Sequence, residues 1–131
     1  MIVLDTSAAI AAIVGVSPHQ ALLARIADAR GIHAPHLIDV EGFSALRGLV
    51  KGGKLSGDRA SDARRDLADL AIRRYPLAGI ADRVWALRNA MSVYDACFVA
   101  LAEALDCPLV TCDSRLARST GHAADIELFE V

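Results

Sequence analysis

The stretch Met1-Ile2-Val3-Leu4-Asp5-Thr6-Ser7 decides the fold of this chain. Its first four residues form an apolar run that stops abruptly at three polar, helix-capping residues. Such a pattern is typical of a buried strand that leads directly into a helix. The apolar residues that follow predict that this helix extends to Val14. A strand followed at once by a helix favours an α/β fold.

Short apolar runs continue to alternate with helical patterns along the rest of the chain. We predict further strands at residues 32–35, 109–112 and 126–131, the last as a partly exposed edge strand. Ser17 and Pro18 are expected to start the second helix. The helical patterns cover residues 18–30, 36–51, 56–72, 76–87 and 92–105, with a short helix after Asp113-Ser114. Strands separated by helices indicate a mostly parallel central sheet with helices on both faces, which is a three-layer α/β/α arrangement.

The composition fits one compact domain that spans residues 1–131. The chain is 54% hydrophobic, and its 14 basic and 16 acidic residues give a net charge of -2. This balance offers no general electrostatic footprint for nucleic acid, so such a partner must be contacted locally. The longest apolar run, residues 8–16, is too short to span a membrane. Because no basic leader precedes Asp5, the pattern predicts a cytoplasmic protein without a membrane partner.

The chain has three cysteines, Cys97, Cys107 and Cys112. No two of them form a Cys-x-x-Cys pair, which argues against a disulfide framework or a zinc ribbon. We therefore expect these thiols to belong to the core.

Four acidic residues lie where polar side chains are unexpected. Asp5 and Asp113 follow predicted strands, and open parallel sheets bind ligands at the carboxyl ends of their strands. Glu41 and Asp95 lie on largely apolar helix faces with no basic residue on the same face. Each has an ordinary alternative: Asp5 and Asp113 as helix N-caps, Asp95 in a capping box with Ser92, and Glu41 as a side chain that reaches water.

The four acids carry more weight together than singly. Carboxylates on neighbouring apolar elements repel one another and raise each other's pKa unless a cation lies among them. Carboxylate and water ligands favour Mg²⁺ or Mn²⁺. One or two such ions can activate a water molecule and stabilise a phosphoryl oxygen.

Basic residues give weaker signals. Arg47, Lys51 and Lys54 lie at helical or near-helical spacing on and after the helix that carries Glu41. They either line an RNA path beside the acids or form an ordinary solvated face. Between residues 62 and 74 arginines are interleaved with aspartates, so their net field is small, and a solvated helix over 56–72 is favoured over an RNA groove. The apolar-rich stretch 85–99 belongs either to the core or to a dimer face.

The chain resembles the PIN-domain family and, within it, the VapC toxins of bacterial VapBC toxin-antitoxin pairs. The resemblance spans essentially the whole chain, and its segments occur in the family's order and spacing. They are Ile2-Val3-Leu4-Asp5-Thr6-Ser7-Ala8, then Glu41 on the third helix, then Ser92-Val93-Tyr94-Asp95-Ala96 leading into Phe98-Val99-Ala100-Leu101-Ala102-Glu103, and finally Pro108-Leu109-Val110-Thr111-Cys112-Asp113-Ser114-Arg115-Leu116-Ala117.

The resemblance implies a PIN-like α/β/α domain that cleaves RNA with Mg²⁺ or Mn²⁺. By this likeness Asp5 and Asp95 are metal ligands, Glu41 holds or orients a water molecule on the metal, and Asp113 binds the metal directly or through water. Thr6 and Thr111 match hydroxyl positions that help to fix the acids. Arg115 is placed to reach a phosphate or an acidic partner. The likeness further implies a homodimer and a VapB-type antitoxin that lays a C-terminal segment across the acidic groove.

Other functions fit the sequence less well. A non-catalytic PIN-like module that binds RNA or an antitoxin is the main alternative, and the complete set of acids argues against it. A phosphoryl-accepting receiver domain would carry a lysine near its last strands, whereas Lys51 and Lys54 lie mid-chain. A serine hydrolase would need a base within reach of a serine, and the four histidines occur in no such motif.

Overall fold

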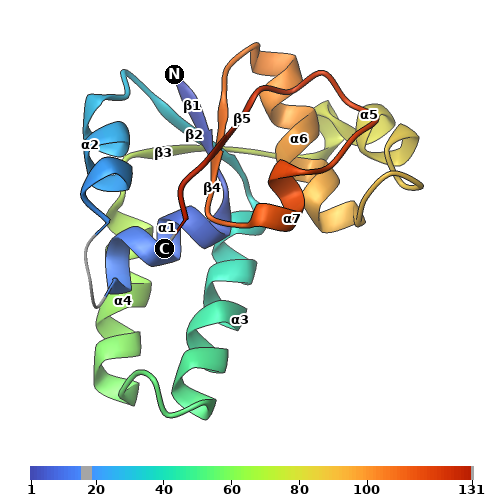
Figure 1. The fold of residues 1–131 in the computed structure, drawn as a ribbon. Helices are drawn as coiled ribbons and strands as arrows, with labels where there is room; N and C mark the ends of the chain where they lie inside the picture. The colour runs from blue at the N-terminus through green and yellow to red at the C-terminus, as the bar shows by residue number, and fades with distance from the viewer. Residues whose placement is uncertain (16–18, 131) are drawn as a thin grey trace.

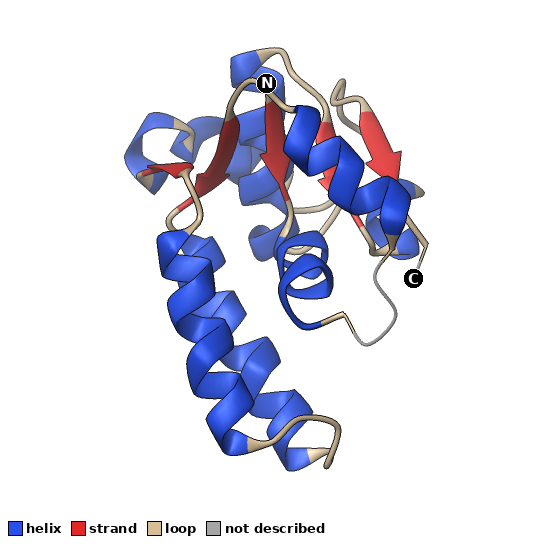
Figure 2. Ribbon diagram, turned by 90° about the vertical axis from the view of Figure 1, so that its left-hand side faces the viewer, coloured by secondary structure: helices blue, strands red, loops and turns tan. Residues whose placement is uncertain are grey.

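The computed structural model describes residues 1–15 and 19–130. Its centre is a five-stranded sheet with the strand order β3-β2-β1-β4-β5, and every neighbouring pair is parallel. The strands are β1 (Ile2–Leu4), β2 (Ile32–Pro35), β3 (Ile72–Tyr75), β4 (Leu109–Thr111) and β5 (Ile126–Leu128). Helices lie in front of and behind the strands (Figure 2). The predicted three-layer α/β/α fold is therefore confirmed, with a fully parallel sheet.

The helices divide between the two faces of the sheet and a projecting arm. They are α1 (Thr6–Val14), α2 (Gln20–Asp28), α3 (Leu37–Lys51), α4 (Gly57–Asp69), α5 (Ala81–Ala86), α6 (Val93–Leu105) and α7 (Ser114–Ala117), with a 3₁₀ turn η1 (Leu77–Gly79) before α5. Helix α6 packs on β1, β2 and β4, with α5 against its outer side. Helices α3 and α4 form a hairpin, here called the arm, that extends away from the sheet (Figure 1).

The core lies around β1 and α6. All three residues of β1 are fully buried, because this strand has a parallel neighbour on each side and helices above and below it. Residues 96–102 of α6 are buried in one run, and Phe98 is among the largest fully buried side chains. The stretch 85–99 therefore divides: Leu87 and residues 96–99 belong to the core, whereas Trp85, Val93 and Tyr94 are exposed.

Close packing holds the two helices of the arm together, and an ion pair joins the arm to the sheet. Gly42 of α3 lies so near α4 that an ideal Cβ there would come within 2.5 Å of Leu67 Cδ2. At the base of the arm, the Arg74 guanidinium donates to both carboxylate oxygens of Asp39 at 2.7 and 3.0 Å, and to the Leu67 carbonyl at 3.1 Å. Ile10 of α1 packs with Leu46 and Ala63 of the arm in a second, smaller core.

Strand β3 corrects the sequence prediction. We expected residues 56–72 to be one solvated helix, but α4 ends at Asp69 and the chain then forms a strand. Because β3 lies at the edge of the sheet, Arg73 is exposed there, while Ile72 is buried. The alternation of apolar and polar residues in so short an edge strand is a weak signal. The helical charge pattern before it therefore dominated the prediction.

Smaller differences concern the ends of elements. The predicted helix from Pro76 begins as the turn η1, and α5 ends at Ala86. The last strand is an edge strand as predicted, but it covers only Ile126–Leu128. Helix α2 begins at Gln20, where the His19 ring accepts a hydrogen bond from the Leu22 N–H. The cap expected at Ser17-Pro18 lies outside the described residues.

No helix within the described part of the chain has both the length and the apolar character needed to cross a membrane.

Two glycines of α3 provide a matched test of the arm. Gly42→Ala must displace Leu67, whereas an ideal Cβ at Gly48 meets nothing within 4 Å. Gly48→Ala should stabilise the fold by about 0.5–1 kcal/mol, because alanine is the better helix former. Gly42→Ala should be less stable than Gly48→Ala by roughly 1–3 kcal/mol because of overpacking. Urea unfolding of both variants measures the difference, and equal stabilities would contradict close packing at Gly42.

Candidate active site

The four predicted acids lie around one cleft, although they come from separate parts of the chain. Asp5 follows β1, Asp113 follows β4, Glu41 lies on α3 and Asp95 in the first turn of α6. The cleft has a volume of about 420 Å³, and its lining comprises the four acids with Thr6, Ser7, Ile10, Ser44, Ala45 and Arg115. Since parallel strands all end at one edge of the sheet, the fold gathers at this edge residues that lie far apart in sequence.

Asp5 is held by two hydroxyl groups. Ser7 Oγ donates to Asp5 Oδ2 at 2.6 Å, and Thr111 Oγ1 donates to the same oxygen at 2.8 Å. Each hydroxyl is oriented in turn by a backbone N–H that donates to it, from Cys112 to Ser7 and from Asp113 to Thr111, at 2.9 and 3.0 Å. Asp5 makes no side-chain capping bond to α1. Its carboxylate is therefore fixed by Ser7 of α1 and Thr111 of β4, and although Asp5 stands at the N-cap position of α1, its side chain does not cap that helix.

Glu41 is half-buried and accepts a hydrogen bond from Thr6. The distance from Thr6 Oγ1 to Glu41 Oε1 is 2.8 Å. Burial raises the pKa of Glu41, the Thr6 hydrogen bond opposes this shift, and the charges of Asp5 and Asp95 add to it. The carboxylate thus points into the cleft instead of reaching freely into water.

Asp95 takes part in the N-terminal cap of α6 and also lines the cleft. Its backbone N–H donates to Ser92 Oγ at 3.1 Å, which is half of the expected capping box. Burial raises the pKa of the Asp95 carboxyl, Arg115 opposes this shift, and the charges of Asp5 and Asp113 add to it. The sequence showed no basic residue on the same helix face, and the compensating arginine comes from α7.

Asp113 is both a helix cap and a cleft residue. Its Oδ1 accepts from the N–H groups of Arg115 and Leu116 at 2.9 and 3.4 Å. Its Oδ2 lies 3.3 Å from Arg115 Nη2, and the same nitrogen lies 3.6 Å from Asp95 Oδ2. The capping alternative is therefore correct for Asp113, but it does not exclude a second role in the cleft.

Ser7 is the residue that sequence reasoning missed. Its position two residues after Asp5 at a helix start is a weak local signal for a hydroxyl near a carboxylate. Its contact with Thr111, at 3.1 Å between the two hydroxyl oxygens, joins residues 104 positions apart. Only the pairing of β1 with β4 brings these two side chains together.

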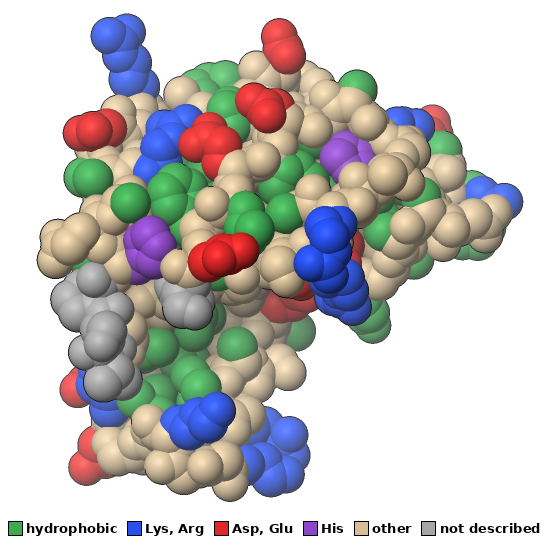
Figure 3. All heavy atoms as spheres, viewed as in Figure 1, with side chains coloured by type: hydrophobic (Ala, Val, Ile, Leu, Met, Phe, Trp, Pro, Cys, Tyr) green, Lys and Arg blue, Asp and Glu red, His purple; other side chains and the backbone are tan. Residues whose placement is uncertain are grey.

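The basic residues Arg47, Lys51 and Lys54 do not line the cleft. All three are exposed. Basic side chains are visible at the far end of the arm in Figure 3. Their exposure fits the solvated-face alternative, and the RNA path stays a prediction.

The donor chemistry of the cleft fits Mg²⁺ or Mn²⁺, which prefer carboxylate and water oxygens. Among the residues that the structure describes, however, no three Asp, Glu, His or Cys side chains already surround one point that could hold an ion. The four acids are adjacent but open, as expected for like charges that share a cleft. Ion binding would have to draw the carboxylates closer or use water molecules as additional ligands.

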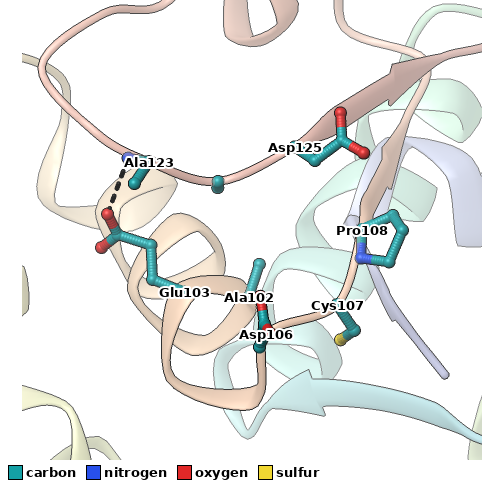
Figure 4. A pocket seen from close by; sticks show the side chains of 8 residues that line it. Ala102, Glu103, Asp106, Cys107, Pro108, Ala123 and Asp125 are labelled. Atoms are coloured by element: carbon teal, nitrogen blue, oxygen red, sulfur yellow. Dashed lines mark hydrogen bonds between the residues drawn. The ribbon is translucent and has the colours of Figure 1, made fainter.

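A second hollow lies at the opposite edge of the sheet, where β4 and β5 begin (Figure 4). Here Glu103 of α6 accepts a two-pronged bond from Arg83 at 2.7 and 3.0 Å and a bond from the Ala123 N–H at 2.8 Å. The Arg83 hydrogen bond is the main cause of the lowered pKa of Glu103. This carboxylate already has a structural role, so it is no candidate for chemistry.

The raised pKa of Glu41 predicts that its ionised carboxylate destabilises the fold, and this can be tested. The ionised carboxylate costs stability at neutral pH, and this cost disappears as pH falls and the folded chain binds a proton at Glu41. In EDTA at pH 7.5, Glu41→Gln should therefore raise Tm by roughly 2–4 °C. The gain should shrink toward pH 5. Differential scanning calorimetry at both pH values measures it.

Glu127→Gln is the matched control for this prediction. The pKa of Glu127 is lowered, mainly by its hydrogen bond from Arg25, so its charge stabilises the fold at neutral pH. This variant should lower Tm at pH 7.5. A decrease of Tm in both variants would show that the Glu41 charge is not under strain.

Comparison with known proteins places this geometry in a family. Residues 2–121 match the family model of the PIN domain. Ribonuclease VapC9 of Mycobacterium tuberculosis is 46% identical over 126 residues, which cover 94% of this chain and 93% of the relative.

Solved structures show the same fold. VapC20 of Mycobacterium tuberculosis, a sarcin-ricin loop cleaving toxin, has a TM-score of 0.69 at 14% identity, and the match covers 94% of this chain and 97% of the other. The VapBC2 structure of Rickettsia felis, bound to a DNA fragment from its promoter, gives a TM-score of 0.67 at 17% identity over 97% and 98% of the two chains. From the family match and the sequence relative, this chain belongs to the PIN-domain family and, within it, to the VapC ribonucleases.

Proposed function

We propose that this chain is a Mg²⁺- or Mn²⁺-dependent endoribonuclease and the toxin of a type II toxin-antitoxin pair. One observation carries the metal dependence: four carboxylates from separate segments, Asp5, Glu41, Asp95 and Asp113, line a single cleft. Two of them, Glu41 and Asp95, have raised pKa values, chiefly through burial. A bound cation would relieve the repulsion that the cleft otherwise maintains.

The four carboxylates would hold the ion, and each has a distinct setting. When bound, such an ion would lower the pKa of water and offset the negative charge that develops on the phosphate. Asp5 is fixed through one oxygen, Oδ2, by Ser7 and Thr111, which leaves Oδ1 directed to other partners. Glu41, with its raised pKa, is suited to accept a proton from water. Its Thr6 hydrogen bond keeps the side chain in the cleft.

The hydroxyl of Ser7 is a positioning group in this proposal. It donates to Asp5 and accepts from the Cys112 backbone, so both of its hydrogen-bonding functions are occupied. Hydrolysis by water needs no nucleophilic side chain. The residues of the cleft would therefore act by orienting the four acids, and charge neutralisation would be supplied by the ion that they hold.

We further propose a cytoplasmic homodimer controlled by a VapB-type antitoxin. The antitoxin proposal is supported by family membership and by the Rickettsia felis VapBC2 structure, whose fold this chain shares. A basic antitoxin side chain in the cleft would compete for the carboxylates. The dimer proposal is supported by three exposed apolar side chains on and near α5 and α6, namely Trp85, Val93 and Tyr94.

Cleavage of a tRNA and rRNA panel tests the nuclease proposal. Wild type should cut a discrete site with Mg²⁺ or Mn²⁺ and lose activity in EDTA. Asp5→Asn and Asp95→Asn should reduce the cleavage rate by at least about 100-fold, because each removes a charge that would hold the ion. Gel analysis of the fragments measures the rate and identifies the cut.

The two variants also control for a contaminating nuclease, which would be unaffected by them. Circular dichroism should show an intact fold for both. Cleavage that persists in EDTA would contradict the metal dependence. RNA binding without cleavage, independent of metal, would favour the binding-module alternative.

A further inference from the structure

Arg115 occupies an unusual position for an exposed arginine. Its side chain is 74% exposed, yet its Nη2 nitrogen lies between two carboxylates, 3.3 Å from Asp113 Oδ2 and 3.6 Å from Asp95 Oδ2. The two acids belong to different elements, the loop after β4 and the helix α6. The guanidinium therefore bridges two of the four acids in the cleft.

This contact is not needed to cap α7. The cap is made by the backbone N–H groups of Arg115 and Leu116, which donate to Asp113 Oδ1. The guanidinium approaches the other oxygen, Oδ2, together with Asp95. The side chain can leave without disturbing the capping bonds.

The guanidinium occupies one acceptor direction on Asp95 Oδ2 and on Asp113 Oδ2, and its positive charge repels a divalent ion that approaches the same oxygens, so the two cations compete for these carboxylates. The arginine carries one positive charge and makes two contacts of moderate length, which is a weak and displaceable interaction at an exposed position. It nevertheless lowers the repulsion between Asp95 and Asp113 in the metal-free chain. No three of the described acids surround one point. This open arrangement agrees with a guanidinium, and not a metal ion, lying between Asp95 and Asp113.

We propose that Arg115 is a tethered cation that competes with the divalent ion for Asp95 and Asp113, so that metal loading requires the guanidinium to leave the cleft. This inference rests on the proposed metal-dependent activity. The displaced side chain remains at the rim of the cleft, where a single positive charge can meet a substrate phosphate. Metal loading thereby exchanges an internal ion pair for a group that is free to bind RNA.

Metal binding to the purified full-length chain tests the competition without relying on cleavage. The probe is Mn²⁺, whose free concentration is followed by electron paramagnetic resonance. Arg115→Gln should lower the Kd for Mn²⁺ by about three- to tenfold, because no internal cation has to be displaced. The same variant should not increase RNA cleavage at saturating Mn²⁺.

Arg118→Gln is the matched control. This exposed arginine lies at the end of the same short helix and forms no ion pair with a described residue. It removes the same charge from the same region, so its Kd should stay within about twofold of wild type. If Arg118→Gln lowers the Kd for Mn²⁺ as much as Arg115→Gln does, the effect comes from the net charge of the region. That result would overturn the proposal of specific competition.

The remaining outcomes separate this inference from the proposed function. Equal Mn²⁺ affinity in wild type and Arg115→Gln overturns the competition but leaves the metal-dependent nuclease in place. Absence of Mn²⁺ binding in both proteins overturns both proposals. Binding that appears only in Arg115→Gln supports the competition in its strongest form.

Discussion

The site depends on the burial of β1 between two parallel neighbours. All three residues of this strand are inaccessible to solvent, and it pairs with β2 on one side and β4 on the other. Parallel pairing on both sides places the end of β1 at the edge of the sheet where the other strands also end. Asp5 is the first residue beyond that point, and Thr6 and Ser7 begin the helix that follows. The register with β4 then fixes which hydroxyls can reach the Asp5 carboxylate.

Carboxylates on a single helix have opposite environments at the two edges of the sheet. Asp95 and Glu103 both lie on α6, but burial raises the pKa of the first, while a two-pronged arginine lowers the pKa of the second. Burial is the main influence at Asp95, whereas at Glu103 the arginine hydrogen bond outweighs it. The partners also differ in geometry, because Arg83 matches Glu103 at 2.7 and 3.0 Å, whereas Arg115 reaches Asp95 only at 3.6 Å. The charge of Glu103, which has a structural role, is well compensated. The charge of Asp95 is incompletely compensated, and it lies at the edge of the sheet where ligands bind in such folds.

The sequence predicted elements whose pattern arises from burial, and it failed where pairing in space decides. Strand β1 and helix α6 were found because continuous apolar runs are required in the interior. Strand β3 was missed because Ile72-Arg73-Arg74-Tyr75 lies at an edge, where polar residues are allowed. The acids were found through their misplaced charge and through the family resemblance. The links from Ser7 to Thr111 and from Arg115 to Asp95 cross between elements, so no local pattern contains them.

The hydroxyl groups explain how the fold tolerates the strained acids. Ser7, Thr111 and Thr6 donate three short hydrogen bonds to carboxylate oxygens, and such charge-assisted bonds are stronger than neutral ones. They hold Asp5 and Glu41 in place without neutralising them, because a hydroxyl keeps no net charge. An arginine in the same positions would neutralise the carboxylates and compete with an ion for their oxygens. Neutral donors deep in the cleft, with one displaceable arginine at its rim, keep the acids both ordered and available.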